Sequence, residues 1–230
     1  MTGSPAEAAV RPSAPGRAAP RHPVVLFDFD GTLADTIPLI LASFRHTVSD
    51  VLGEDVTEEE ARSWIGRTLD DIFSERYPDH ADLLTQTYRT WNLANHDELI
   101  RPVEGIPELL DTLVAAGSRL GVVSSKGAHV VRRGLAAVGL DHDFEVVAGL
   151  EATALHKPHP DPLLYAAGVL SVAPADCAYV GDAVVDVRAA LAAGMRPVAV
   201  TWGAGTAAEL TAAGPSAVAS TAGELVGILT

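Results

Sequence analysis

Residues 24–32 read VVLFDFDGT, four apolar residues followed directly by two acids one residue apart. An apolar run of this length predicts a fully buried strand. Because alternate side chains of a strand point the same way, we expect Asp28 and Asp30 to place two carboxylates close together beyond its end. A divalent cation removes the repulsion between two such groups, and carboxylate oxygens suit Mg²⁺. The alternative is a plain turn, because Asp and Gly often follow a strand for that reason alone.

Further short apolar runs alternate with helical segments along the rest of the chain. They predict strands at 120–123, 145–147, 178–180 and 197–200. The predicted helices lie between them: one opened by Pro107 and ended by Gly117, one at 128–138, one capped by Asp161, and one that follows Asp182 and runs to Gly194. This alternation predicts an α/β fold, a parallel sheet with helices on both faces, whose ligands bind beyond the carboxyl ends of the strands.

Residues 38–102 break this alternation and contain no convincing strand. Thr57 with Glu60 forms the sequence pattern of a capping box, followed by an amphipathic run. We therefore predict an all-helical cap inserted after the first strand. The expected domains are a flexible N-terminal tail at 1–22, an α/β core at 23–37 and 103–230, and the helical cap at 38–102.

Composition excludes several classes of protein. The 230 residues carry 16 Lys and Arg against 30 Asp and Glu, a net charge of −14, so we expect no nucleic-acid partner and no membrane surface. The single cysteine, Cys177, excludes an internal disulfide, and its place in a predicted strand makes a buried, inert thiol the expectation. Together with the lack of a long apolar run, this indicates a cytoplasmic protein.

The first 22 residues contain four prolines and three arginines without an apolar period. A flexible extension is the expectation. A secretory signal matches poorly, and the prolines interrupt the amphipathic helix that a transit peptide would form.

A second pair of acids follows the predicted strand 178–180. Asp182 and Asp186 lie one turn apart if a helix begins near Asp182. Asp182 could complete a metal site with Asp28. Asp186 could support these ligands without binding the metal itself. Helix capping is the alternative for either acid taken alone.

The chain has only two lysines, Lys126 and Lys157, and both fall at the predicted edge where the acids lie. Ser124 and Ser125 follow the predicted strand 120–123 and precede Lys126. A hydroxyl and ammonium groups at this edge could hold phosphate oxygens. A solvated surface lysine is the alternative for each.

Four segments in this order resemble the motifs of the haloacid dehalogenase superfamily: FDFDGTLADT at 27–36, VVSSK at 122–126, HKPHPDP at 156–162 and VGDAVVD at 180–186. The closest resemblance is to the phosphoglycolate phosphatase-like branch with a helical cap, from about Val24 to the end. It implies a Rossmann-like core and a Mg²⁺-dependent phosphatase acting on a small phosphorylated metabolite, with 2-phosphoglycolate the leading substrate. A monomer or homodimer is expected.

The resemblance also implies a role for each motif residue. Asp28 would be the nucleophile that becomes an aspartyl-phosphate, and Asp30 would act as general acid and then base. Ser124 and Lys157 would bind the phosphoryl group. The implied Mg²⁺ ligands are Asp28, the main-chain carbonyl of Asp30, and Asp182, with Asp186 nearby.

Three further residues are candidates for substrate contact or support. Ser125 stands where family members often have Asn, which alters the contacts near the substrate, and Lys126 matches a lysine often found there. Arg67, in a segment that resembles the glycine-containing cap loop of this branch, could bind the non-transferred end of the substrate; a solvated arginine is the alternative. His156 and His159 are not expected to bind a metal.

Other activities stay open at this point. A phosphosugar mutase keeps both acids, and a pyrophosphatase of the same fold has the same motifs. A catalytically silent ligand-binding protein is the reading from a different class, disfavoured because all the acids, the hydroxyl and the lysine are present. Dehalogenases lack an acid at the position of Asp30, and phosphonatases need a cap lysine, whereas residues 38–102 contain none.

Overall fold

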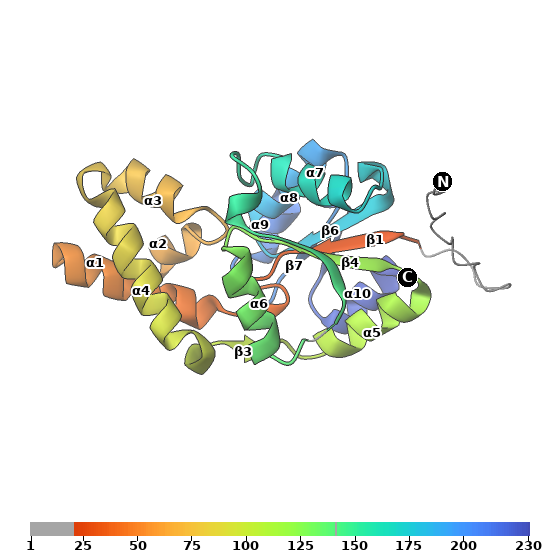
Figure 1. The fold of residues 1–230 in the computed structure, drawn as a ribbon, viewed down its shortest axis with the longest axis horizontal. Helices are drawn as coiled ribbons and strands as arrows, with labels where there is room; N and C mark the ends of the chain where they lie inside the picture. The colour runs from red at the N-terminus through yellow and green to blue at the C-terminus, as the bar shows by residue number, and fades with distance from the viewer. Residues whose placement is uncertain (1–20, 141) are drawn as a thin grey trace, which may run out of the picture.

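A parallel six-stranded sheet forms the centre of the molecule in the computed structural model, which describes residues 21–140 and 142–230 (Figure 1). The strand order is β5-β4-β1-β6-β7-β8. Their bounds are β1 Val24–Phe27, β4 Arg119–Val123, β5 Phe144–Ala148, β6 Cys177–Gly181, β7 Arg196–Val200 and β8 Ala217–Ala219. The five predicted strands are confirmed. The predicted tail at 1–22 lies outside the described residues, apart from its last two.

The strand β1 lies in the middle of the sheet, between β4 and β6. Its last residue, Phe27, pairs with Val122 on one side and Val180 on the other. All four β1 side chains are fully buried, since both faces of the sheet are covered. The register therefore brings the residues that follow β1, β4 and β6 to one edge of the sheet.

Helices cover both faces of the sheet, as predicted (Figure 1). On one face pack α5 (Ile106–Ala116), α6 (Ala128–Ala137) and α10 (Ala222–Leu229). On the other pack α7 (Asp161–Val169) and α8 (Val184–Ala193), with α9 (Ala207–Ala212) against α8. The short 3-10 turns η2 (Leu150–Ala152) and η3 (Pro174–Asp176) complete the connections.

Two predicted helix starts shift slightly. Asp161 is the first residue of α7 rather than its cap, because Pro160 occupies the N-cap position. The helix α8 begins at Val184, so Asp182 precedes the helix and only Asp186 lies in its first turn.

The segment between β1 and the rest of the sheet is helical, as predicted (Figure 1). It contains α1 (Ile37–Leu52), α2 (Glu58–Ser63), α3 (Leu69–Arg76), η1 (Pro78–His80) and α4 (Ala81–Leu99). We call residues 37–99 the helical insertion. Two short antiparallel strands flank it, β2 (Ala34–Asp35) and β3 (Arg101–Pro102). The prediction of no strand in 38–102 is therefore wrong at β3, because a two-residue strand has no periodicity to recognise.

The helical insertion has an apolar core of its own. The Phe44 ring lies 4.9 Å from that of Trp64 and 4.8 Å from that of Tyr88, centroid to centroid, and 6.0 Å from that of Phe73. Aromatic pairs at such distances add to the burial of their surface. The domain limits stay a prediction.

The capping residue expected at Thr57 is present. Its side chain accepts a hydrogen bond from the Glu60 backbone N–H at 3.2 Å, which begins α2. The Glu60 carboxylate pairs with Arg76 of α3, so it links the two helices.

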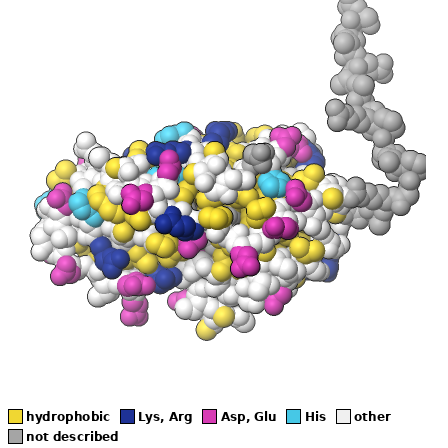
Figure 2. Space-filling view, turned by 90° about the horizontal axis from the view of Figure 1, so that it is seen from below, with side chains coloured by type: hydrophobic (Ala, Val, Ile, Leu, Met, Phe, Trp, Pro, Cys, Tyr) yellow, Lys and Arg dark blue, Asp and Glu magenta, His cyan; other side chains and the backbone are white. Residues whose placement is uncertain are grey.

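The surface carries charges of both signs. On the face shown in Figure 2, acidic, basic and apolar side chains of the described residues are interspersed. Within the described ranges, no helix combines the length and apolar character needed to cross a membrane. Cys177 is buried, as predicted, and burial raises the pKa of its thiol to about 11.

Candidate functional site

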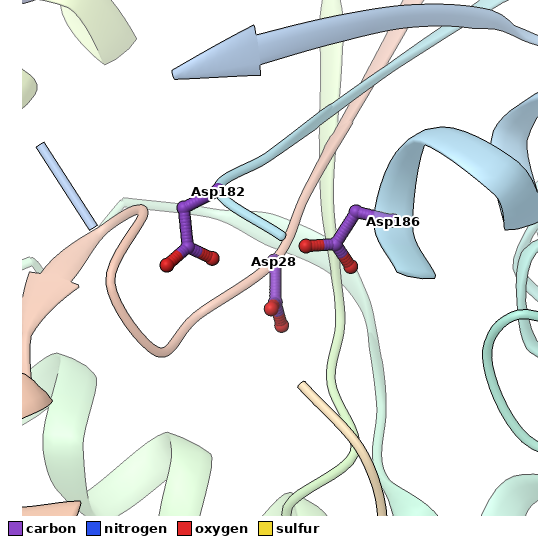
Figure 3. A group of neighbouring side chains, drawn as sticks. All are labelled: Asp28, Asp182 and Asp186. Atoms are coloured by element: carbon purple, nitrogen blue, oxygen red, sulfur yellow. The ribbon is translucent and has the colours of Figure 1, made fainter. Parts of the chain in front are cut away.

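Three buried carboxylates meet at the carboxyl edge of the sheet (Figure 3). Asp28 follows β1, Asp182 follows β6, and Asp186 lies in the first turn of α8. One oxygen from each lies within 4.8 Å of the others, and each residue is at most 3% exposed. The structure thus brings together acids from two motifs that lie about 150 residues apart in the sequence.

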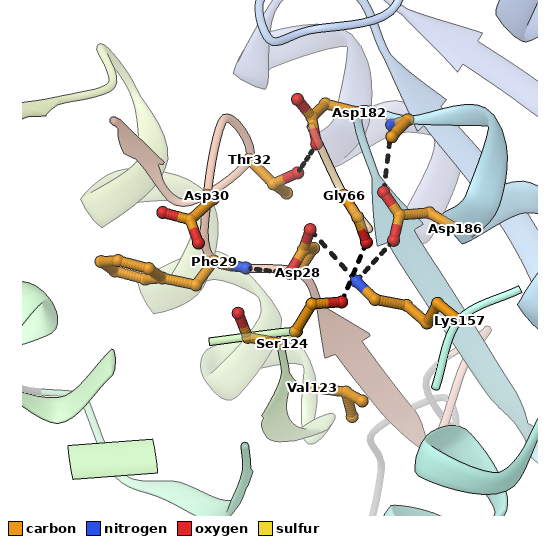
Figure 4. A network of polar contacts seen from close by, with 12 residues as sticks. Asp28, Phe29, Asp30, Thr32, Gly66, Val123, Ser124, Lys157, Asp182 and Asp186 are labelled. Carbon is orange, nitrogen blue, oxygen red and sulfur yellow. Dashed lines mark hydrogen bonds and ion pairs between the residues drawn. The ribbon is translucent and has the colours of Figure 1, made fainter. Parts of the chain in front are cut away.

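Lys157 lies between two of these acids (Figure 4). Its Nζ donates a hydrogen bond to Asp186 Oδ1 at 2.7 Å and lies 3.2 Å from Asp28 Oδ2. It also donates to the Tyr179 hydroxyl at 3.0 Å, and that hydroxyl donates to the Val123 carbonyl at 2.9 Å. Tyr179 was not predicted to belong to the site, because a tyrosine in a buried strand gives no signal beyond packing.

The cluster has more negative than positive charge. Three carboxylates face one ammonium group, which leaves an excess of two negative charges away from water. Burial, opposed by Lys157, raises the pKa of Asp28 to about 7, with Asp186 and Asp30 adding to the rise. Burial and the neighbouring Asp186 and Asp28 raise the pKa of Asp182 well above its usual value. A divalent cation would neutralise this excess, and an all-oxygen ligand set suits Mg²⁺.

The ammonium group of Lys157 stays charged in this environment. Burial alone would lower its pKa, but the carboxylates of Asp186 and Asp28 outweigh burial and hold the pKa well above its usual value. A fixed positive charge therefore lies beside Asp28.

Gly31 and Gly203 make space for the Asp182 side chain because they carry no Cβ. A Cβ at Gly31, where φ is +71°, would lie 2.2 Å from Asp182 Oδ2, and a Cβ at Gly203 would lie 2.0 Å from the same atom. The Ala204 backbone N–H donates to this oxygen at 2.7 Å, and the Thr32 hydroxyl donates to the other at 3.4 Å. Gly203 was not predicted to belong to the site, because the sequence does not show that the loop after β7 reaches Asp182.

Asp30 turns its carboxylate away from the acidic cluster. The Lys126 ammonium donates a hydrogen bond to Asp30 Oδ1 at 2.6 Å, and both side chains are about 15% exposed. The Ser124 hydroxyl accepts a hydrogen bond from the Lys126 backbone N–H at 3.1 Å. Asp30, which follows β1, therefore lies next to Ser124 and Lys126, which follow β4.

A cavity of about 380 Å³ separates this edge from the helical insertion. Asp28, Asp30 and Ser124 line one end of the cavity. Phe44 and Tyr88 of the helical insertion are among the residues that line the other. A small molecule bound at Asp28 would therefore also contact the insertion.

A loop of the helical insertion reaches the site. The Ser125 hydroxyl donates to the Gly66 carbonyl at 2.9 Å, which ties this loop to the end of β4. Gly66 has φ +91°, and a Cβ there would lie 2.8 Å from Val185 Cγ2. Arg67 lines the cavity and pairs with Glu75 at 2.5 Å. Its role toward the substrate stays a prediction.

Comparisons with known proteins agree with this geometry. The family model for haloacid dehalogenase-like hydrolases matches residues 25–200. Pyrophosphatase PpaX of Bacillus pumilus is 39% identical over 178 residues, which are 77% of this chain and 82% of that protein. A Bacteroides fragilis structure named as a haloacid dehalogenase-like hydrolase superposes with a TM-score of 0.83 at 31% identity, covering 89% of this chain and 99% of that one. A predicted phosphoglycolate phosphatase from Haemophilus somnus has a TM-score of 0.80 at 25% identity, covering 90% and 98%.

The family model spans most of the chain and includes the helical insertion. Site residues and the sequence match therefore lead to the same assignment. The chain belongs to the haloacid dehalogenase-like hydrolases.

Proposed function

We propose that this enzyme is a Mg²⁺-dependent phosphatase that passes the phosphoryl group of a small phosphorylated compound to Asp28 and then to water. The observation that carries the proposal is the place of Asp28. Asp28 directly follows the central strand β1 and lines the cavity. Its carboxylate lies 3.2 Å from the Lys157 ammonium group.

In the first step an oxygen of Asp28 attacks phosphorus. A bond forms between this oxygen and phosphorus, and the bond from phosphorus to the leaving oxygen breaks. Lys157 and Ser124 hold the phosphoryl oxygens, and the ammonium group offsets their charge. Mg²⁺ held by Asp28, the Asp30 carbonyl and Asp182, with Asp186 beside them, would add the positive charge that the transferring group needs.

Asp30 supplies the proton chemistry of both steps. Protonated Asp30 gives its proton to the leaving oxygen. The resulting carboxylate then takes a proton from the water that attacks phosphorus, and the bond from phosphorus to Asp28 breaks, which releases phosphate and restores the Asp28 carboxylate. The ion pair with Lys126 at 2.6 Å holds the Asp30 carboxylate at the cavity.

Two substrate classes follow from the relatives. Phosphate monoesters such as 2-phosphoglycolate match the motif resemblance and the Haemophilus somnus structure. Pyrophosphate matches the name of the Bacillus pumilus relative. A phosphosugar mutase is the alternative chemistry, because it uses the same two acids.

The test is a screen for phosphate release, with Mg²⁺ and with EDTA. Its substrates are 2-phosphoglycolate, pyrophosphate, sugar phosphates and nucleoside monophosphates. We expect Mg²⁺-dependent release from the wild type and a loss of at least ~10³-fold in Asp28→Asn, which keeps the side-chain shape. Full activity of this variant would contradict the proposal. Interconversion of hexose phosphates without phosphate release would favour the mutase.

A further inference from the structure

The part of the cavity beyond the acids is mostly apolar, although Asn92, His129 and Glu151 are among its lining residues. Its walls come from the helical insertion and from the segments around α6 and η2. The side chains that form them include Ile40, Phe44, Trp64, Ile65, Val130 and Leu150. Water in such a space is readily displaced by an apolar group.

The cations that line the cavity already have carboxylate partners. The pairs are Lys126 with Asp30 at 2.6 Å, Arg67 with Glu75 at 2.5 Å, and Arg89 with Asp70 at 3.8 Å. No other lysine or arginine lines the cavity among the residues that the structure describes. A second anionic group on the substrate would therefore compete with a protein carboxylate for each of these cations.

The amide that lines the cavity is also used within the protein. Asn92 donates through its Nδ2 to the Ser43 hydroxyl at 2.9 Å, and that hydroxyl donates to the Leu39 carbonyl at 2.7 Å. These hydrogen bonds lie inside the helical insertion and use one N–H of the Asn92 amide.

The volume exceeds what a phosphoryl group needs. A cavity of about 380 Å³ falls in the range of pockets for small organic ligands, roughly 300–1,000 Å³. Pyrophosphate would leave much of it unfilled and would face apolar walls with its second charged group.

We infer that the preferred substrate is a phosphate monoester whose leaving group is an uncharged, largely apolar alcohol, about the size of a substituted aromatic ring. The leaving group lies against the helical insertion while the phosphoryl group lies at Asp28. This inference rests on the phosphatase function proposed above and narrows its substrate class.

Matched substrates test the inference. Benzyl phosphate and 4-carboxybenzyl phosphate release similar alcohols and differ in the charge at the far end. We expect kcat/KM to be at least ~10-fold higher for benzyl phosphate than for 4-carboxybenzyl phosphate, 2-phosphoglycolate or pyrophosphate. Equal or reversed preference overturns the inference and leaves the phosphatase function standing. Failure to release phosphate from any of these compounds or from acetyl phosphate overturns the phosphatase function, and the inference with it.

Two leucines of α4 supply a matched pair of variants. Leu93 lines the cavity and is 36% exposed, whereas Leu83 is 52% exposed and does not line it. Leu93→Lys adds a cation at the rim, so we expect it to reduce the preference for benzyl over 4-carboxybenzyl phosphate by at least ~5-fold. Leu83→Lys should keep the wild-type preference, and equal Tm values confirm that both variants fold. The same preference in both variants would overturn the inference.

Discussion

Lys157 Nζ lies 3.2 Å from Asp28 Oδ2, and each residue is only 3% exposed. The two residues come from the loop before α7 and from the end of β1, 129 positions apart in the sequence. Removing one partner of a buried ion pair leaves an uncompensated charge, which is far more destabilising than losing a surface pair. The contact therefore contributes both to the stability of the fold and to the proposed phosphoryl site.

The Lys157→Met variant should lose both activity and thermal stability. We expect kcat/KM to fall by about 10²–10³-fold, because the phosphoryl oxygens lose their fixed positive charge. The Tm should also fall, because Asp28 and Asp186 then face each other without a cation between them. Steady-state kinetics and calorimetry check the two effects.

The other lysine is the control for this variant. Lys126→Met removes a pair that is about 15% exposed, so its loss of Tm should be smaller. A Lys157→Met enzyme that keeps more than about a tenth of wild-type kcat/KM would contradict the role given to Lys157.

Without a divalent cation, the acidic cluster should make stability depend on pH. The pKa of Asp28 is raised to about 7 and that of Asp182 is raised too, so the folded chain binds more protons than the unfolded one. The contribution of Asp28 is fully present below about pH 4, its unfolded pKa, and is lost as pH rises through about 7. The pKa of Asp182 is also raised, so its contribution is likewise lost as pH rises. In EDTA we expect the Tm to be roughly 5 °C lower at pH 8 than at pH 5, and Mg²⁺ to restore it at pH 8.

Asp182→Asn isolates this effect from the other titrating groups, which are common to both proteins. The variant should show a smaller fall in Tm between pH 5 and pH 8, and a weaker gain with Mg²⁺. An identical pH dependence and Mg²⁺ response in wild type and variant would contradict a cation site at Asp182.

The contact between the Gly66 loop and the end of β4 should matter for activity. In Gly66→Ala the new methyl would meet Val185 Cγ2 at 2.8 Å, so we expect the loop to shift and kcat/KM to fall by about 10-fold or more. Ser125→Ala removes the hydrogen bond to the Gly66 carbonyl, worth about 1 kcal/mol, so KM should rise a few-fold with little change in Tm.

Gly53→Ala is the matched control for the glycine variant. Gly53 also has a positive φ, +69°, but a Cβ there would contact nothing within 4 Å. Both alanine variants should lose Tm through backbone strain, while only Gly66→Ala should lose activity. Equal activities of the two would show that the loop position does not affect the site.

The sheet and the meeting of its motifs could be predicted from the sequence. The apolar run before Asp28 marks a buried strand, and the carboxyl ends of parallel strands share one edge. The observed register, with Phe27 between Val122 and Val180, produces this juxtaposition. The catalytic roles of the residues brought there stay predictions.

Other features depend on tertiary contacts that leave no local pattern. The strand β8 is three residues long, Ala-Val-Ala, and gains its place by pairing with β7. Gly203 comes close to Asp182 because the loop after β7 packs against the residue that follows β6. The pairing of Arg67 with Glu75 joins a loop to a helix eight positions on, which the spacing alone does not show. Such contacts follow only once the elements are packed.

Covalent trapping at Asp28 tests the proposed chemistry most directly. The enzyme is mixed with Mg²⁺ and benzyl phosphate, quenched in acid, and treated with borohydride, which reduces an aspartyl-phosphate to homoserine. Peptide mass spectrometry then locates the product. We predict homoserine at position 28, absent from Asp28→Asn and from samples without substrate. An enzyme that turns over under these conditions but yields no homoserine, or yields it at Asp30, Asp182 or Asp186 instead, would contradict Asp28 as the nucleophile.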